Sequence, residues 1–122
     1  EITAAFAAGQ IGTTLENLHA AAHGEEHEWK TMYPEFAKVA REEGFEKAAK
    51  LFEFIAVAEK YHDERYRTLA AHVEGGTVFK RDEPVTWRCR HCGYTHTGTE
   101  APKACPACAH PQAHFEVLCN HY

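Results

Sequence analysis

The chain has 122 residues, of which 44% are hydrophobic, and a formal net charge of −5. This length suits one ordinary domain, or one small domain plus a second one stapled by a metal ion. No apolar run approaches the roughly 20 residues of a membrane span, and no segment reads as a secretory signal, so we expect a cytoplasmic protein without a membrane partner. The negative charge argues against a nucleic-acid partner, because binding to phosphates needs clustered Lys and Arg.

The two ends of the chain differ in chemistry. Residues 1–79 carry a net charge of −6 and no cysteine, whereas residues 80–122 carry +1 and all five cysteines. We therefore expect a helical domain over residues 1–80 and a metal-binding domain over residues 85–122, joined near Lys80–Pro84.

A first helix is predicted over about residues 13–43. Thr13 and Glu16 fit a capping box at its start, and Gly44 suits its end. Pro34 lies inside the helix and should kink or locally widen it, because the carbonyl of Lys30 loses its hydrogen-bond partner. Steps of three and four residues place one set of side chains on a single face: Leu15, Leu18, Ala22, Glu25, Trp29, Met32, Phe36 and Val39.

A second helix is predicted over about residues 45–74, and Gly75–Gly76 ends it. The connection between the two helices is so short that they should be antiparallel neighbours in a helical hairpin. The same stepping defines one face of this helix: Phe45, Ala48, Phe52, Ile55, Glu59, His62, Tyr66, Leu69 and Val73.

Carboxylates interrupt both apolar faces. Glu25 in the first helix, and Glu59 with His62 in the second, occupy positions where the pattern calls for apolar residues, and a buried carboxylate must meet a cation, a metal ion or a proton. Glu59 and His62 form a Glu-x-x-His unit whose side chains point the same way. Glu28 lies one position off the strict pattern and has weaker support. Alternatively, Glu25, Glu26 and Glu28 form a solvated acidic face, but the facing Glu-x-x-His unit favours a metal site.

Two further features are left outside the predicted sites. His19, His23 and His27 form a stripe beside the apolar face, which we interpret as a partly exposed polar flank rather than a zinc site. Cys119 has no C-x-x-C partner and is interpreted as a small hydrophobic residue.

The remaining four cysteines form two C-x-x-C units, Cys89/Cys92 and Cys105/Cys108. Paired units of this kind make a closed four-thiolate site for zinc or iron, and they favour metal over disulfides in a chain without an export signal. The spacing alone does not separate zinc from iron. The strings around them, Trp87 to Tyr94 and Cys105 to Cys108, closely resemble rubredoxin, in which the metal is a redox iron. In that interpretation the two aromatic residues shield the site from solvent.

The order of motifs along the whole chain closely resembles the rubrerythrin family. The resemblance rests on Gly24–Trp29, Met32–Pro34 and Ala58–His62, followed by the rubredoxin-like tail. It implies a ferritin-like four-helix domain with a non-haem di-iron centre, followed by a domain with a mononuclear iron held by four cysteines, with zinc as the alternative metal. It also implies an oxidoreductase that reduces hydrogen peroxide to water and receives electrons from an external reductase.

The resemblance also assigns residues. It implies that Glu25, Glu28, Glu59 and His62 are iron ligands at the catalytic site and that Tyr33 is a hydrogen-bonding residue beside them. The chain departs from the family in one respect, because a rubrerythrin begins with two further helices that carry a Glu and a second Glu-x-x-His. About six protein ligands are expected for two irons.

The ligand set is therefore expected to be completed from outside this hairpin. The stretch Glu1–Gly9 resembles the crossover that joins two helical hairpins, and a chain that opens on Glu1 rather than Met leaves room for processing or truncation. A preceding segment or a separate fragment could supply the first hairpin, and this is the preferred explanation. Alternatively, two copies of the chain could dock their hairpins; in both cases we expect an oligomer, such as a dimer, rather than a bare monomer.

Two other classes of function compete with the peroxidase. A zinc-ribbon interaction module on a helical scaffold would explain the cysteines but not Glu59 and His62 on an apolar face. An iron-storage protein would explain the carboxylates, but it would not need the thiolate domain.

Overall fold

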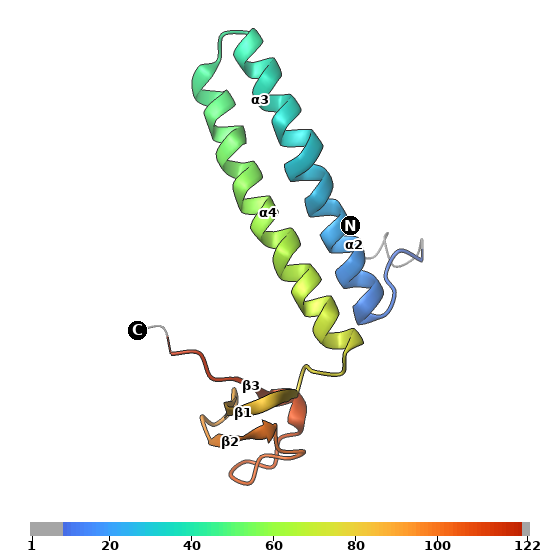
Figure 1. Ribbon diagram of the computed structural model, residues 1–122, viewed down its shortest axis with the longest axis vertical. Coiled ribbons are helices and arrows are strands. Elements are labelled where there is room, and N and C mark those ends of the chain that lie inside the picture. The colour runs from blue at the N-terminus through green and yellow to red at the C-terminus, as the bar shows by residue number, and fades with distance from the viewer. Residues whose placement is uncertain (1–8, 121–122) are drawn as a thin grey trace. The chain divides into compact units, whose positions relative to one another are not determined.

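The computed structural model describes residues 9–120, which divide between Glu74 and Gly75 into two compact units. The first unit is a long helical hairpin, and the second is a small three-stranded antiparallel sheet with long loops (Figure 1). This confirms the predicted combination of an all-α hairpin with a small β-rich domain. Residues 1–8, most of the expected crossover, lie outside the described part. None of the helices in the described part is long and apolar enough to cross a membrane.

One arm of the hairpin runs from Thr14 to Glu42 with a change of helix type in its middle. The capping box is confirmed at its start, because the Glu16 backbone N–H donates to Thr13 Oγ1 at 3.3 Å and the Thr13 backbone N–H donates to Glu16 Oε2 at 2.8 Å. The arm consists of the α-helix α2 (Thr14–His27), the π-helical turn η1 (Glu28–Met32) and the α-helix α3 (Tyr33–Glu42).

The π-helical turn stands immediately before Pro34. The Tyr33 backbone N–H donates to the carbonyl of Glu28, five residues earlier. Because proline has no N–H and its ring crowds the preceding turn, the helix widens over the residues before it. The predicted local widening at Pro34 is confirmed.

The connection between the two arms is a Schellman turn. The Phe45 backbone N–H donates to the carbonyl of Ala40 at 2.7 Å, and the Gly44 backbone N–H donates to that of Arg41 at 3.1 Å. Gly44 has a φ of +84°, a left-handed conformation that suits glycine. The second arm is α4 (Glu46–Glu74), which lies antiparallel beside the first (Figure 1).

Small side chains form the interface between the two arms. The larger apolar side chains Phe36, Val39 and Phe45 remain 44%, 44% and 62% exposed. Most of the predicted apolar face is therefore an open surface beside the interface, although Ala22 of that face is buried. Alanine lets two helices pack closely, because it adds little bulk between them. The buried apolar residues of the hairpin are Ala22, Ala37, Ala40, Ala49 and Ala70.

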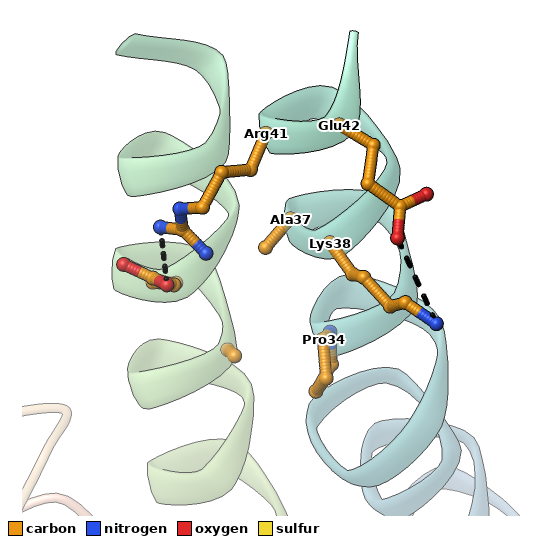
Figure 2. A pocket seen from close by; sticks show the side chains of 7 residues that line it. Pro34, Ala37, Lys38, Arg41 and Glu42 are labelled. Carbon is orange, nitrogen blue, oxygen red and sulfur yellow. Dashed lines mark hydrogen bonds and ion pairs between the residues drawn. The ribbon is translucent and has the colours of Figure 1, made fainter. Parts of the chain in front are cut away.

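Ion pairs tie the arms together near both ends of the hairpin. Near the turn, Arg41 Nη2 donates to Glu53 Oε1 at 2.8 Å, and Figure 2 shows Arg41 reaching from α3 toward α4 beside Ala37. At the other end His19 Nε2 lies 3.2 Å from Glu74 Oε1. These pairs are about half exposed, so each contributes little to stability.

The second unit is built on a short antiparallel sheet with the strand order β2-β1-β3. Its strands are β1 (Lys80–Cys89), β2 (Thr95–Glu100) and β3 (Phe115–Val117), and the 3-10 turn η2 (Gln112–His114) precedes β3. Its core consists of Trp87, Cys89, Ala101, Cys105 and Phe115.

The first strand begins earlier than the sequence-based division of the chain. Lys80 pairs with Glu100, and the stretch from Lys80 to Pro84, which was interpreted as a joint between domains, belongs to β1. Packing explains this difference. Phe79 packs against the core of the sheet, and its carbonyl accepts a hydrogen bond from the backbone N–H of Ala101 at 2.9 Å.

Candidate metal centres

The two C-x-x-C units bring four sulfur atoms into one compact group. The Sγ atoms of Cys89, Cys92, Cys105 and Cys108 all lie within 4.8 Å of one another. Two of these separations are 3.8 Å (Cys89 to Cys108) and 3.6 Å (Cys92 to Cys105). A metal–sulfur bond of about 2.3 Å gives a tetrahedron with edges of about 3.8 Å. The sulfur atoms thus fit one tetrahedral metal ion and are too far apart for disulfides, whose sulfur atoms lie about 2.05 Å apart.

The pKa values of two of the thiols, those of Cys89 and Cys108, also point to a cation. Burial alone would raise the pKa of the Cys89 thiol, but hydrogen bonds from the backbone N–H groups of Cys92 and His91 outweigh it and lower the pKa to about 7. The His110 backbone N–H favours the Cys108 thiolate, yet burial and the three neighbouring sulfur atoms raise its pKa to about 12. Four thiolates so close together repel one another, and a metal ion removes that repulsion.

The two knuckles have the same backbone design. In the first, the Gly93 backbone N–H donates to the carbonyl of Cys89 at 2.9 Å; in the second, the Ala109 backbone N–H donates to that of Cys105 at 2.8 Å. The φ angles are +82° at Gly93 and +59° at Ala109. The left-handed conformation is free of strain only for glycine, so the second knuckle holds a strained alanine.

This difference gives a reciprocal pair of substitutions. Ala109→Gly should raise the free energy of unfolding of the second unit, and Gly93→Ala should lower it, each by about 1 kcal/mol. No atom lies within 4 Å of a Cβ placed on Gly93, so the effect there is conformational rather than steric. Denaturant unfolding of the metal-loaded chain measures both changes. Effects of the same sign would contradict this explanation.

Aromatic side chains cover one side of the thiolate site. Trp87 is fully buried, and its Nε1–H donates to the carbonyl of Gly98 at 2.9 Å. Tyr94 packs against the same core. Cys89 and Cys105 are buried, whereas Cys92 is exposed. The site is therefore shielded by the sheet and open to solvent at Cys92.

A second group of ligand atoms lies on the hairpin. One carboxylate oxygen each of Glu25 (α2) and Glu59 (α4) and one ring nitrogen of His62 (α4) all lie within 4.8 Å of one another. His62 Nδ1 lies 2.6 Å from Glu59 Oε2 and 3.6 Å from Glu25 Oε2. Ligand atoms bound about 2.1 Å from one metal ion lie roughly 3–4 Å apart. Small shifts of these side chains would thus place a first-row metal ion among them.

Glu25 is the residue of this group that most needs a cation. Its Oε2 atom is buried and has no hydrogen-bond partner. Burial raises the pKa of the Glu25 carboxyl, and the nearby Glu59 carboxylate raises it further. A buried oxygen atom without a partner is costly, and a metal ion would satisfy it.

Glu28 is the predicted ligand that lies outside this compact group. It is the first residue of the π-helical turn η1, a type of turn that is frequent at functional sites. Tyr33 follows the turn. Burial raises the pKa of the Tyr33 phenol, and the carboxylates of Glu28, Glu59 and Glu25 raise it further. This phenol therefore stays protonated and can donate a hydrogen bond.

Sequence reasoning missed a polar cluster in the middle of the hairpin. Trp29 was expected on the apolar face with Glu25, but its Nε1–H donates to Asp63 Oδ2 at 3.1 Å. Arg67 Nε donates to the other oxygen of Asp63 at 2.6 Å. The i,i+4 spacing of Asp63 and Arg67 is a signal that could have indicated the ion pair. Nothing in the sequence shows that Asp63 is buried.

The histidine stripe and Cys119 lie outside the two groups of ligand atoms found among residues 9–120. In the stripe of three histidines, His19 pairs with Glu74, and His23 Nδ1 lies 3.8 Å from Glu26 Oε2. Cys119 is exposed and lies outside the four-thiolate group.

A helical hairpin with a carboxylate–histidine site, followed by a four-thiolate knuckle pair, defines a class of non-haem iron protein with two kinds of metal centre. The comparison with protein families agrees. The family described as "Rubrerythrin" matches residues 1–70, and "Rubrerythrin, rubredoxin-like domain" matches residues 87–116. The chain belongs to the rubrerythrin family. Its cofactors are those of the family, a carboxylate-bound di-iron centre and a rubredoxin-like four-cysteine centre.

Individual relatives support this assignment and show how much of them the chain spans. It is 57% identical to a rubrerythrin of Porphyromonas gingivalis over 122 residues, which are 100% of this chain and 61% of the relative. It is 56% identical to a rubrerythrin of Nitratidesulfovibrio vulgaris over 118 residues, 97% of this chain and 62% of the relative. A solved structure described as a partially reduced state of nigerythrin has 33% identity and a TM-score of 0.51, covering 88% of this chain and 51% of that one.

The chain thus spans about three fifths of the length of these curated relatives. Membership of the family supports an iron-binding redox function.

Proposed function

We propose that this chain belongs to a non-haem di-iron peroxidase that reduces hydrogen peroxide to water. The observation that carries the proposal is the buried, unpartnered Glu25 carboxylate oxygen, which faces Glu59 and His62 across the hairpin. The presence of a thiolate centre in the same chain supports a redox role over iron storage. The combination also disfavours a zinc-ribbon interaction module, which would not need the hairpin ligands.

The overall reaction is balanced when one hydrogen peroxide takes up two electrons and two protons and gives two waters. When bound, the di-iron centre supplies the two electrons that break the O–O bond. We assign to Glu25, Glu59 and His62 the role of holding the metal, with the carboxylates neutralising its charge, and Glu28 joins them from the π-helical turn. The protonated phenol of Tyr33 is suited to donate a hydrogen bond to the substrate.

The thiolate centre is proposed as the electron relay. A site that exchanges one electron at a time must return two electrons in sequence for each peroxide consumed. The exposed Cys92 gives an external reductase a point of approach, while Trp87 and the sheet shield the other side. The reduced thiolates of this centre suit a reducing compartment such as the cytoplasm.

This hairpin supplies too few ligands for two irons, so we propose that a second hairpin supplies the others. About six protein ligands are expected for two irons, and this chain offers Glu25, Glu28, Glu59 and His62. The open apolar surface that includes Phe36 and Phe45 supports a further helical layer beside the site. We propose that adjoining sequence or a separate fragment supplies this layer, with a second copy of the chain as the alternative, in an oligomer.

The proposal is tested by the stoichiometry of peroxide consumption. The full-length iron-loaded protein, reduced and kept free of oxygen, is mixed with substoichiometric hydrogen peroxide. We expect two ferrous ions, counted over both centres, to be oxidised for each peroxide consumed, without release of oxygen. Protein loaded with zinc at both sites is the control and should leave peroxide intact. Release of oxygen, or survival of peroxide with the reduced iron protein, would refute a peroxidase.

A further inference from the structure

A polar cluster centred on Asp63 lies inside the otherwise apolar interface of the hairpin. Asp63 is 5% exposed and is the only buried charged residue among residues 9–120. One of its oxygen atoms accepts the indole N–H of Trp29 from the opposite arm at 3.1 Å, and the other accepts the Nε–H of Arg67 from its own helix at 2.6 Å. Both oxygen atoms of a buried carboxylate are thus satisfied, and one bond crosses between the arms.

The cluster extends back to the first arm through Arg67. Its Nη2 donates to Glu26 Oε2 at 2.8 Å, and Lys30 pairs with the other oxygen atom of Glu26. The ammonium groups of Lys30 and Lys60 lie 5.1 and 5.6 Å from the centre of the Trp29 ring. Asp63 is therefore linked to the first arm by two routes, one through Trp29 and one through Arg67 and Glu26.

Each anchor point of this cluster is adjacent in sequence to a candidate metal ligand. Glu26 follows Glu25, Trp29 follows Glu28, and Asp63 follows His62. Successive residues of an α-helix point about 100° apart around the axis, since a turn takes 3.6 residues. Holding one of two neighbouring side chains in a fixed direction therefore limits the rotation of the helix, and with it the side on which the other side chain leaves the backbone.

We propose that Asp63 is a positioning residue for the carboxylate site. It sets the rotation and register of α4 against the first arm, so that Glu59 and His62 converge on Glu25. The inference deepens the proposed function, because it depends on metal binding at this site, but it does not depend on the reaction with peroxide.

Apolar packing fixes the register less firmly away from the turn of the hairpin than near it. Near the turn, Phe52 of α4 packs against buried alanines, and its ring lies 6.1 and 5.6 Å from those of Tyr33 and Phe36. The other buried apolar residues of the hairpin are Ala22 and Ala70, whose single methyl groups interlock less deeply than larger side chains. The ion pairs near the ends, such as Arg41 with Glu53, are about half exposed and worth little.

A rotation or slip of α4 against the first arm would separate Asp63 from Trp29 and Arg67 from Glu26. It would leave one oxygen atom of a buried carboxylate without its hydrogen-bond partner, which is unfavourable. The contact of Asp63 with Trp29 thus disfavours other registers of the two arms.

The test compares two cross-helix contacts in the full-length protein. Asp63→Asn keeps the shape of the side chain but removes its charge and one acceptor. Arg41→Gln is the matched control, because it breaks another inter-arm contact, shown in Figure 2, away from the metal site. Ferrous iron is titrated into each protein, and the absorption spectrum of the oxidised carboxylate site is recorded. The four-thiolate iron of the same molecule is an internal control.

We expect Asp63→Asn to weaken iron binding at the carboxylate site by about 10- to 100-fold, as for other residues that orient metal ligands, and to alter its spectrum. Arg41→Gln should leave the iron affinity and the spectrum of the carboxylate site unchanged, even where it lowers the melting temperature. The four-thiolate iron should be unaffected in Asp63→Asn and in Arg41→Gln. Trp29→Phe removes only the N–H donor and should weaken iron binding in the same direction. This milder variant keeps the test decisive if Asp63→Asn does not fold.

The inference would be overturned if Asp63→Asn or Trp29→Phe bound iron with the affinity and spectrum of the Arg41→Gln control. It would also be overturned if all variants lost iron in proportion to their loss of thermal stability. Failure of the proposed function has a different signature, because a wild-type protein that binds iron at both centres but leaves peroxide intact refutes the peroxidase without changing the ranking of these variants.

Discussion

Replacing Glu59 or His62 by alanine should remove most of the iron from the carboxylate site, whereas Glu28→Ala should retain clearly more. Glu59 and His62 lie on one face of α4 with ligand atoms 2.6 Å apart, and both face the buried oxygen of Glu25. Loss of either ligand leaves a metal ion with an open position and a cavity beside it. Glu28 lies outside this compact group, on the π-helical turn, where its carboxylate has more freedom.

The measurement is iron stoichiometry after reconstitution and desalting, with the four-thiolate iron counted separately from its visible absorption. Removal of a ligand should weaken metal binding by at least the 10- to 100-fold typical of residues that merely orient ligands. Glu64→Ala, an exposed carboxylate on the same helix, is the matched control and should keep the full iron content. Equal iron loss in Glu28→Ala, Glu59→Ala and His62→Ala would show that the ranking by position is wrong.

Local signals in the sequence predicted the elements of the hairpin well. The capping box at Thr13 and Glu16, the left-handed Gly44 and the widening before Pro34 each depend on a few neighbouring residues, and the structure has all three. The four-thiolate group was predictable for the same reason, since its two C-x-x-C units are local and a tetrahedral ion requires them to meet.

The interface between the arms was not predictable by the same route. Hydrophobic periodicity selects large apolar side chains, so it placed Trp29 with Phe36 on one apolar face. In the structure the alanines are buried and Phe36 is half exposed, because the closest packing of two helices uses the smallest residues. The periodicity therefore detected a partly open face, along which Glu25 of one arm meets Glu59 and His62 of the other at the edge of the interface.

The burial of Asp63 depends on a contact that periodicity does not describe. The π-helical turn interrupts regular stepping just where Trp29 lies, and the indole N–H then meets a carboxylate 34 residues away. Only the folded hairpin brings this pair together.

Replacing Cys105 by serine should abolish steady-state peroxide reduction while a single addition of peroxide still oxidises the iron at the carboxylate site. Cys105 is buried and supplies one of the four sulfur ligands. The hydroxyl of serine is a poor replacement, because the metal ions that bind four thiolates prefer sulfur to oxygen ligands. Without the relay, electrons no longer return from the reductase. Turnover with reductase should fall by at least about tenfold, the lower end of the losses seen even for residues outside the ligand set.

The single-turnover measurement separates electron supply from chemistry. The variant is reduced chemically, without the reductase, and mixed with one equivalent of peroxide per carboxylate site. Since Glu25, Glu59 and His62 lie on the hairpin and are untouched, the rate and extent of iron oxidation should match those of the unmodified protein. Cys119→Ser is the matched control, because this exposed cysteine lies outside the four-thiolate group and its loss should leave turnover unchanged. If Cys105→Ser also loses single-turnover oxidation, the thiolate centre takes part in the chemistry itself and the assigned division of roles is wrong.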